Sequence, residues 1–389
     1  MPKINPEIET FARIKVIGVG GSGVNAVNHM VRSGVKGVDF IGINTDAQHL
    51  HHSPIKKRIH IGKTLTRGLG TGMNPEIGRK AAEESGQEIQ EIIKGADMIF
   101  IAGGMGGGTC TGAAPFVAKT AKDQGVLTIA IVTKPFFFEG NQRMLLADKG
   151  IEELRAEVDA IIVIPNDRLL GIIDKTTTCL SAFATCDEVL RQAVEGLSNL
   201  ITTPGIINVD FADIRAIMAN AGSALMGIGA AAGDNRAIEA AKAAINSPLL
   251  DLSIDGAKGV LFAIAGGNDM TMFEIQEAAK VIIESVDPNA KIIFGAIHDN
   301  KLNKNEIRVT VMASGFPENS KKKPPLGNFD SKAPASPSSN GHAEAPPLDL
   351  TADFKVKKPE PVRTVKTPAE EEDDEWSSIP AFLRRPKIK

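Results

Sequence analysis

The segment at residues 103–112, Gly-Gly-Met-Gly-Gly-Gly-Thr-Cys-Thr-Gly, constrains the fold of this chain more than any other part of the sequence. Six of its ten residues are glycine, and each glycine raises the entropy of the unfolded chain, so an ordinary connection would not concentrate them. The segment follows a strand candidate, Asp97–Gly103, and opens a helical pattern, Thr109–Asp123. Successive free backbone N–H groups beside two threonine hydroxyls form an anion-binding nest suited to a polyphosphate.

An earlier glycine loop, residues 18–26 (GVGGSGVNA), lies between another strand candidate and another helix; we call it the first glycine loop, and residues 103–112 the second. A helix N-terminus presents free N–H groups and a positive dipole end, so this loop also predicts a phosphate site. Gly18, Gly20 and Gly23 fit G-x-G-x-x-G, and Asp46 lies where a ribose-binding acid is expected, which leaves a dinucleotide-dependent oxidoreductase as an alternative. A dinucleotide fold needs only one such loop, so two loops favour a nucleoside triphosphate. The G-x-x-x-x-G-K-[ST] pattern of P-loop enzymes does not occur in the sequence.

Apolar runs alternate with helical patterns along the first half of the chain. Near-continuous apolar strands separated by helices predict a parallel, Rossmann-like α/β sheet covered on both faces. The strand candidates are Arg13–Gly18, Val38–Asn44, Asp97–Gly103, Val126–Thr133 and Asp159–Ile164, and the helical stretches between them are Pro75–Ile93, Thr109–Asp123 and Gln142–Ala156.

A longer helical pattern, Leu180–Leu200, separates this unit from a smaller α/β unit. The second unit contains a helix from Ile214, strand Gly259–Gly266, helix Phe273–Ser285, and strands Lys291–His298 and Glu306–Ala313. A polar stretch joins the last two strands, which predicts an antiparallel hairpin.

The composition changes after Phe316. Residues 317–368 are rich in Pro, Ser, Lys and Ala, which predicts a disordered linker because the segment cannot bury enough apolar surface to offset its ordering entropy. An acidic run, Glu370–Glu375, precedes the final peptide, in which Ile379, Phe382 and Leu383 form an i, i+3, i+4 apolar anchor.

Net charge and hydropathy exclude several classes of protein. A formal net charge of −3 gives no basic footprint for nucleic acid. No apolar run reaches transmembrane length, and Met1–Arg13 lacks the apolar core of a signal peptide. Three cysteines do not form a disulfide framework. We therefore expect a cytoplasmic protein that neither binds nucleic acid directly nor inserts into the membrane.

The second glycine loop resembles the tubulin signature G-G-G-T-G-[ST]-G, and the first resembles its partner in the FtsZ family, the bacterial homologues of tubulin. The similarity covers about Ile14 to Phe316 and the final peptide. It also includes Asn44-Thr45-Asp46, Thr133-Lys134-Pro135-Phe136, Phe138-Glu139-Gly140, Pro165-Asn166-Asp167 and Asn208-Val209-Asp210-Phe211-Ala212-Asp213.

The resemblance implies a tubulin-type GTPase that binds GTP with Mg²⁺, without a dedicated metal site of protein side chains. It implies a flexible N-terminus (1–12), a GTP-binding domain (13–178), a connecting helix (179–203), a C-terminal α/β domain with the catalytic loop (204–316), a disordered linker (317–375) and a partner-binding peptide (376–389). Phe183 would stack on guanine, and Asp187 would accept hydrogen bonds from its amide and amino edge. The implied nucleotide contacts are Gly21, Ser22, Gly23, Val24, Asn25, Gly107, Gly108, Thr109, Cys110, Glu139, Arg143, Asn166, Phe183 and Asp187.

Asp210 and Asp213 lie three residues apart at the start of a predicted helix, so both carboxylates share one face. From the residues alone, helix capping by Asn208 or Asp210 and a dipole contact by Asp213 are the favoured explanation of these side chains. The resemblance implies instead that Asn208, Asp210 and Asp213 complete the active site of a neighbouring subunit and orient the attacking water.

The same resemblance implies head-to-tail filaments that form the scaffold of the division ring at mid-cell. The final peptide would bind membrane-attached division proteins of the FtsA type. A scaffold that binds nucleotide without hydrolysing it remains an alternative.

Cys110 departs from the family pattern, which has glycine at this position. A positive φ there would cost a cysteine about 1–2 kcal/mol, whereas a negative φ would cost little. A thiol at a helix N-terminus is expected to have a lowered pKa. We therefore expect Cys110 to react with alkylating reagents in the nucleotide-free protein, and GTP to protect it; a buried, inert cysteine is the alternative.

Overall fold

The fold is described from a computed structural model of the chain. It describes residues 12–170, 177–203, 205–247, 254, 256–299, 302 and 305–316. The predictions for the N-terminal segment before Ala12, the linker and the final peptide lie outside these residues. Within the described residues, no helix is both long enough and apolar enough to cross a membrane.

The described elements confirm the predicted alternation of strands and helices. The strands are β1 (Ile14–Val19), β2 (Val38–Asn44), β3 (Lys57–His60), β4 (Met98–Gly104), β5 (Leu127–Lys134), β6 (Ala160–Pro165), β7 (Gly222–Ala232), β8 (Gly259–Gly266), β9 (Lys291–His298) and β10 (Glu306–Ser314). The helices are α1 (Gly20–Arg32), α2 (Ala47–His51), α3 (Lys63–Thr66), α4 (Pro75–Glu84), α5 (Gly86–Ile93), α6 (Gly108–Asp123), η1 (Phe137–Glu139, a 3₁₀ turn), α7 (Asn141–Glu157), α8 (Asn166–Leu170), α9 (Cys179–Thr202), α10 (Phe211–Met218), α11 (Arg236–Ile245) and α12 (Met272–Ile283).

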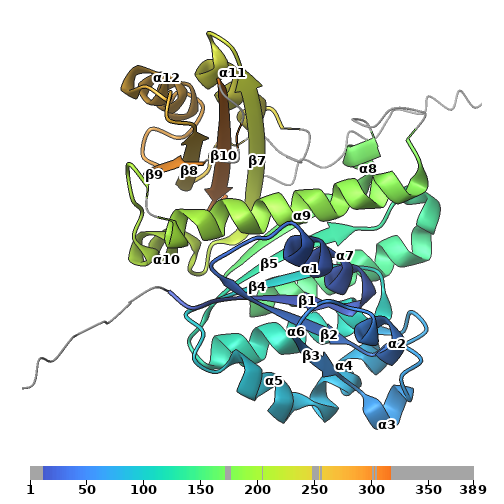
Figure 1. The fold of residues 1–389 in the computed structure, drawn as a ribbon. Coiled ribbons are helices and arrows are strands. Elements are labelled where there is room, and N and C mark those ends of the chain that lie inside the picture. The colour runs from blue at the N-terminus through green and yellow to red at the C-terminus, as the bar shows by residue number, and fades with distance from the viewer. Residues whose placement is uncertain are drawn as a thin grey trace, which may run out of the picture. The chain divides into compact units, whose positions relative to one another are not determined.

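The strands form one sheet in the order β3-β2-β1-β4-β5-β6-β7-β10-β8-β9. All pairs from β3 to β6 are parallel. Adjacent residues of β1 face opposite layers: Val16 is buried with α1 and α9, and Ile17 with α4, α5, α6 and α7. Figure 1 shows α9 crossing above the parallel strands β1, β4 and β5, and α5 and α6 below them. The structure therefore confirms the parallel sheet covered on both faces.

The predicted hairpin between the last two strands is wrong. β9 pairs parallel with β8, while β10 lies between β7 and β8 and is antiparallel to both. β10 buries Ile307, Val309 and Val311, as expected of an internal strand, whereas β9 leaves Phe294 partly exposed, as expected of an edge. The helical connection through α12 allows β8 and β9 to run parallel.

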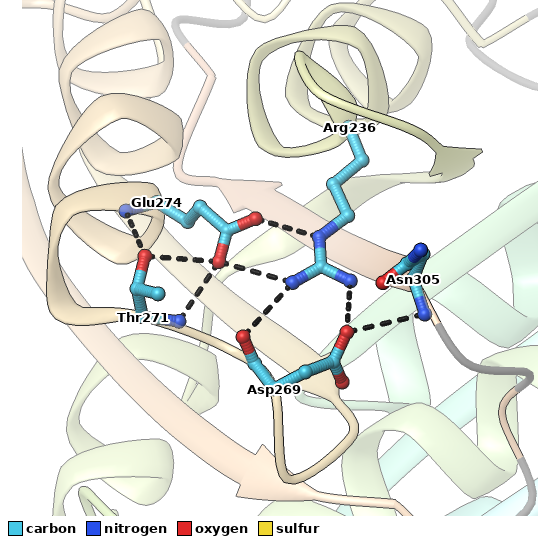
Figure 2. Close-up of polar contacts among 5 residues, drawn as sticks. All are labelled: Arg236, Asp269, Thr271, Glu274 and Asn305. Atoms are coloured by element: carbon cyan, nitrogen blue, oxygen red, sulfur yellow. Dashed lines mark hydrogen bonds and ion pairs between the residues drawn. The ribbon is translucent and has the colours of Figure 1, made fainter.

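A buried arginine joins several turns of the C-terminal half (Figure 2). Arg236, at the start of α11, donates through Nε to Glu274 Oε1 at 2.6 Å and through Nη1 to Asp269 Oδ2 at 2.5 Å. Thr271 and Glu274 form a capping box that begins α12. Asn305, before β10, donates its backbone N–H to Asp269 Oδ2 at 3.1 Å. We call these five residues the Arg236 cluster.

Candidate functional site

The two glycine loops meet at one edge of the sheet. β1 and β4 are neighbouring parallel strands in the register Ile14↔Met98 to Gly18↔Ala102, so their carboxyl ends lie together. The order β3-β2-β1-β4-β5-β6 reverses direction between β1 and β4. Ligands of open α/β sheets bind at such a switch point. No described side chain caps the N-terminus of α1 or α6, so the first N–H groups of both helices are free for an anion.

A cavity of about 590 Å³ opens at this edge, a size that suits a nucleotide. Twelve of the fourteen predicted nucleotide contacts line it. They are Gly21, Ser22, Asn25, Gly107, Gly108, Thr109, Cys110, Glu139, Arg143, Asn166, Phe183 and Asp187. Residues from the first loop, the second loop, η1, α7, α8 and α9 therefore converge on one space.

Gly21 and Gly107 show where the backbone is open to a ligand. Gly107 has a φ of −83°, and neither residue is among those with positive φ, so neither backbone requires glycine. A Cβ at either position would meet no heavy atom within 4 Å among the described residues. Both border the cavity. The protein itself does not require glycine at these two positions. A close approach of the backbone to a ligand explains why glycine is present there.

Three threonine hydroxyls gather beside the second loop. Thr109 Oγ1 lies 2.7 Å from Thr45 Oγ1 and 3.4 Å from Thr71 Oγ1. Thr45 directly follows β2, and Thr71 lies in the connection before α4. Neither Thr45 nor Thr71 was among the site residues predicted from the sequence. The signal for Thr45 was its place at the carboxyl end of a predicted parallel strand.

Glu139 and Arg143 form an ion pair at the wall of the cavity. Arg143 Nη1 donates to Glu139 Oε2 at 2.5 Å, and Glu139 Oε1 accepts the backbone N–H of Phe136 at 3.0 Å. The Glu139 carboxylate is thereby fixed at the start of η1, and it holds the guanidinium of Arg143 beside the space between the loops.

The far end of the cavity has polar groups in an apolar setting. Asn166 is 6% exposed, and its Oδ1 has no hydrogen-bond partner among the described residues. Such an acceptor requires a donor from a ligand or water. Burial raises the pKa of Asp187 to about 6, with a smaller opposing effect of His29. The Phe183 ring is 43% exposed and packs edge-to-face on Phe136, with centroids 5.4 Å apart. An exposed ring beside two acceptors suits a planar base that carries N–H donors.

Gly23 and Val24 differ from the other predicted contacts. Val24 is fully buried in the core between α1 and the sheet, so only its backbone remains for a ligand. A Cβ at Gly23 would lie 2.3 Å from the carbonyl oxygen of Ala102, so glycine is required there by the contact between α1 and β4.

Cys110 contradicts the expectation of a reactive thiolate. It lies in the first turn of α6 without a positive φ, so the backbone cost is small. Its side chain points into the protein and is 3% exposed, and burial raises the pKa of the thiol to about 12. Desolvation therefore outweighs the helix dipole. We now expect little alkylation of Cys110 with or without GTP, measured by mass spectrometry of the labelled peptides.

Asn208, Asp210 and Asp213 lie away from the cavity, beyond the other end of α9. The 24 residues of α9 span roughly 36 Å at about 1.5 Å per residue. Phe183 and Asp187 are near its beginning, whereas α10 follows its end, and Figure 1 shows α8 and α10 at opposite ends of α9.

The three catalytic candidates are exposed. Asp210 occupies the N-cap position of α10, yet its side chain accepts no capping hydrogen bond from the described residues. Asn208 Oδ1 accepts the backbone N–H of Gly205 at 2.7 Å. Asp210 therefore does not cap α10 through its side chain. Asn208 forms its hydrogen bond within its own loop and does not cap the helix.

The described residues contain no group of three or more His, Cys, Asp or Glu side chains that could hold a metal ion. The oxygen donors that line the cavity include the Asp46 carboxylate and the hydroxyls of Thr45 and Thr109. Mg²⁺ is usually held by one or two protein ligands together with substrate phosphates and water, so these residues fit a metal that arrives with a nucleotide.

Two family models match the chain. The GTPase domain of the Tubulin/FtsZ family matches residues 13–174, and the C-terminal domain of the FtsZ family matches residues 222–317. A solved structure described as an empty FtsZ dimer from M. jannaschii is 47% identical, with a TM-score of 0.76, over 79% of this chain and 89% of that chain. The CetZ2 protofilament from Haloferax volcanii with bound GTPgS is 21% identical, with a TM-score of 0.67, over 79% and 94%, and shows similarity of fold.

Proposed function

Because this chain belongs to the FtsZ family of tubulin-related GTPases, we propose that it binds GTP in the cavity between its glycine loops. We further propose that it hydrolyses GTP at the contact between two subunits. The observation that carries the first proposal is the convergence of twelve predicted residues on one cavity. The free N–H groups of α1 and α6 take the phosphates, and Glu139 and Arg143 lie near the ribose and phosphates.

The base end of the cavity fits guanine. Asn166 Oδ1 and the Asp187 carboxylate are both acceptors, and guanine presents N–H donors at N1 and N2. Adenine lacks a donor at N1, so it would leave one of these acceptors unpaired, which is costly in a buried site. Phe183 supplies a face for stacking.

Magnesium is part of the proposal. When bound with the nucleotide, Mg²⁺ neutralises charge that develops on the phosphates. Thr45, Thr71, Thr109 and Asp46 supply the oxygen donors that fit it.

The catalytic carboxylates act on the nucleotide of a second subunit. Asp210 and Asp213 are exposed and are separated from their own cavity by the length of α9. Asn208, braced by Gly205, positions the loop, and the two carboxylates orient and polarise the water that attacks the γ-phosphate. A site made in this way is incomplete in one molecule and complete in a pair.

The pairing is head to tail. Exposed apolar side chains lie at both ends of α9: Phe137, Phe138 and Leu180 beside the cavity, and Ile206 beyond the C-terminal end. The contact joins two different surfaces, and a rotation between subunits that does not close into a ring produces filaments. The 47% identical structure that is described as an FtsZ dimer supports self-association. The proposed division at residues 13–178, 179–203 and 204–316 makes α9 the connection between the two halves of each contact.

A binding competition tests the nucleotide assignment. The nucleotide-stripped protein should bind GTP at least about tenfold more tightly than ATP, because ATP leaves a buried acceptor unpaired. It should release inorganic phosphate from GTP. Tight binding of NAD in preference to GTP would instead support the oxidoreductase alternative.

In the cell, the filaments would form the scaffold of the division ring at mid-cell in the cytoplasm. Membrane-attached proteins of the FtsA type would bind residues 376–389, which lie outside the described residues. Deleting residues 376–389 should leave GTP hydrolysis and assembly largely intact and abolish recruitment to vesicles that carry such a partner. Loss of hydrolysis on deletion would show that this peptide belongs to the folded unit.

A further inference from the structure

The side chain of Cys110 fills the space between the two glycine loops. A Cβ built on Gly103, in β4, would lie only 2.3 Å from Cys110 Sγ and 3.1 Å from the carbonyl oxygen of Val19. The sulfur thus occupies the place of the side chain that Gly103 lacks. On the side of the first loop, a Cβ on Gly20 would lie 3.2 Å from Cys110 N and 3.4 Å from Cys110 Cβ.

The contacts of Cys110 reach both loops and the sheet beneath them. Its Sγ lies 3.9 Å from Met105 Sδ, and both residues are 3% exposed. Hydrogen bonds of the neighbouring threonines hold the same turn of α6 in place. Thr109 bonds to Thr45, and Thr111 Oγ1 accepts the N–H of Gly106 at 2.9 Å. Cys110 is the residue of this turn that packs against Gly103 and the first loop.

A second observation points to a ligand in the same cavity. Asn166, which is 6% exposed, presents an Oδ1 without a partner among the described residues, and both Asn166 and Cys110 line the cavity. Hydrogen bonds from backbone N–H groups weaken steeply when their angle departs from linearity, so the spacing of the two loops decides how well both sets of N–H groups meet one polyphosphate.

We propose that Cys110 is a positioning residue that sets the spacing of the two glycine loops and so aligns their N–H groups with the phosphates. The proposal rests on the proposed binding of GTP in this cavity. It explains why a buried thiol replaces the glycine of the family pattern: a small apolar side chain fills the gap over Gly103 without reaching the ligand. The side-chain volumes at positions 103 and 110 are then coupled, because a larger residue at one position requires a smaller residue at the other.

Exchange of the two side chains tests the proposal. Gly103→Ala places a methyl group against the sulfur and should force the loops apart. Cys110→Ala removes the sulfur and leaves a gap. In the double variant the new methyl occupies the place of the sulfur at an ordinary 3.6 Å from the Cβ of residue 110, and its closer 3.1 Å contact with the carbonyl oxygen of Val19 requires a shift of only a few tenths of an ångström. Affinities for GTP and for guanosine, which lacks phosphates, are measured by equilibrium dialysis on the full chain, with thermal unfolding as a check of folding.

The expected order of affinity for GTP is wild type and double variant, then Cys110→Ala, then Gly103→Ala. Gly103→Ala should lose about tenfold or more, the equivalent of one misaligned charge-assisted hydrogen bond, while the double variant stays within about threefold of the wild type. Guanosine affinity should stay constant throughout. If Gly103→Ala does not fold, the comparison of Cys110→Ala with the double variant still shows whether filling the gap over residue 103 restores the affinity for GTP.

Three results would each overturn the proposal. The first is a loss of GTP affinity in the double variant equal to the sum of the two single losses, and the second is an equal loss of affinity for GTP and for guanosine. The third is that neither Cys110→Ala nor Gly103→Ala changes the affinity for GTP. Failure of the wild-type protein to bind GTP more tightly than guanosine would instead overturn the proposed function.

Discussion

At the scale of single residues, Asp187 makes a prediction that depends on pH. Burial raises its pKa to about 6, so the empty protein takes up a proton there as the pH falls through that value. The N–H donors of guanine need the ionised form, so binding of GTP releases the proton and affinity rises with pH. We expect affinity to increase about tenfold between about pH 5 and about pH 7 and to level off above.

Asp187→Asn is the control for this titration. An amide keeps one acceptor and adds donors that face the donors of guanine, so affinity near neutral pH should fall roughly 10–100-fold. The ionisation of the GTP phosphates is common to both proteins, so the ratio of their affinities isolates Asp187. A ratio that does not change with pH would show that Asp187 does not titrate on binding.

Single residues also show the limits of the sequence. The glycine loops could be assigned to phosphate from their composition and position. Asn166, Phe183 and Asp187 could be assigned only through the resemblance, because one aromatic, one amide and one acid on helices are far more often core or surface residues. The direction of the Cys110 side chain depends on packing against Gly103, which no local pattern encodes.

At the scale of elements, the Arg236 cluster predicts a large effect on stability. Arg236 is 5% exposed, and its hydrogen bonds to Glu274 and Asp269 raise the pKa of the guanidinium and lower the pKa of each carboxyl group. Arg236→Met leaves Glu274, which is mostly buried, without its partner. We expect a loss of roughly 2–3 kcal/mol in the free energy of unfolding, measured by urea denaturation, because the charge of Glu274 loses its partner. The loss is smaller than for a fully buried ion pair, because water still solvates the partly exposed Asp269 side chain.

Arg79→Ala is the matched control for the Arg236 cluster. Arg79 pairs with Glu83 at i, i+4 on α4, and both side chains are exposed. Such pairs contribute about 0.3–0.5 kcal/mol. Equal losses in the two variants would mean that the Arg236 cluster stabilises the C-terminal half no more than a surface pair does.

Elements with strong apolar patterns were predicted within a few residues of their bounds, whereas β7 and α11 were missed. Both are built mainly from small residues, GSALMGIGAAA and RAIEAAKAAI, which give little hydrophobic periodicity. The glycines of β7 carry a packing signal instead. A Cβ at Gly227 would lie 2.0 Å from the carbonyl oxygen of Ala244, so glycine in this strand marks the close packing of α11.

At the scale of the whole molecule, the position of β10 could not be predicted. The sequence places β9 and β10 next to each other along the chain, and a hairpin is the usual result for neighbours. The insertion of β10 between β7 and β8 depends on long-range burial of Ile307, Val309 and Val311. Asp210 and Asp213 lie beyond the far end of α9, which is the basis of the proposed catalytic site shared between subunits.

Two variants test the two parts of that proposed site, the carboxylates and the nucleotide cavity, one at a time. Asp210→Ala should bind GTP normally and lose about 10²–10⁴-fold in turnover, equivalent to about 3–5 kcal/mol. Asp234→Ala, an exposed carboxylate in the turn after β7, is the control and should keep its activity. Gly107→Glu should fold, because its backbone tolerates a side chain, and should exclude GTP by filling the phosphate space with a negative charge.

The most direct test is the rate of GTP hydrolysis by an equal mixture of Asp210→Ala and Gly107→Glu, measured against total protein concentration. Each variant alone should be inactive. In the mixture, the intact nucleotide site of one subunit meets the intact carboxylates of the other, so activity should appear and rise steeply above a threshold concentration. A mixture as inactive as its components, or wild-type activity per subunit that stays constant at high dilution, would contradict a catalytic site shared between subunits.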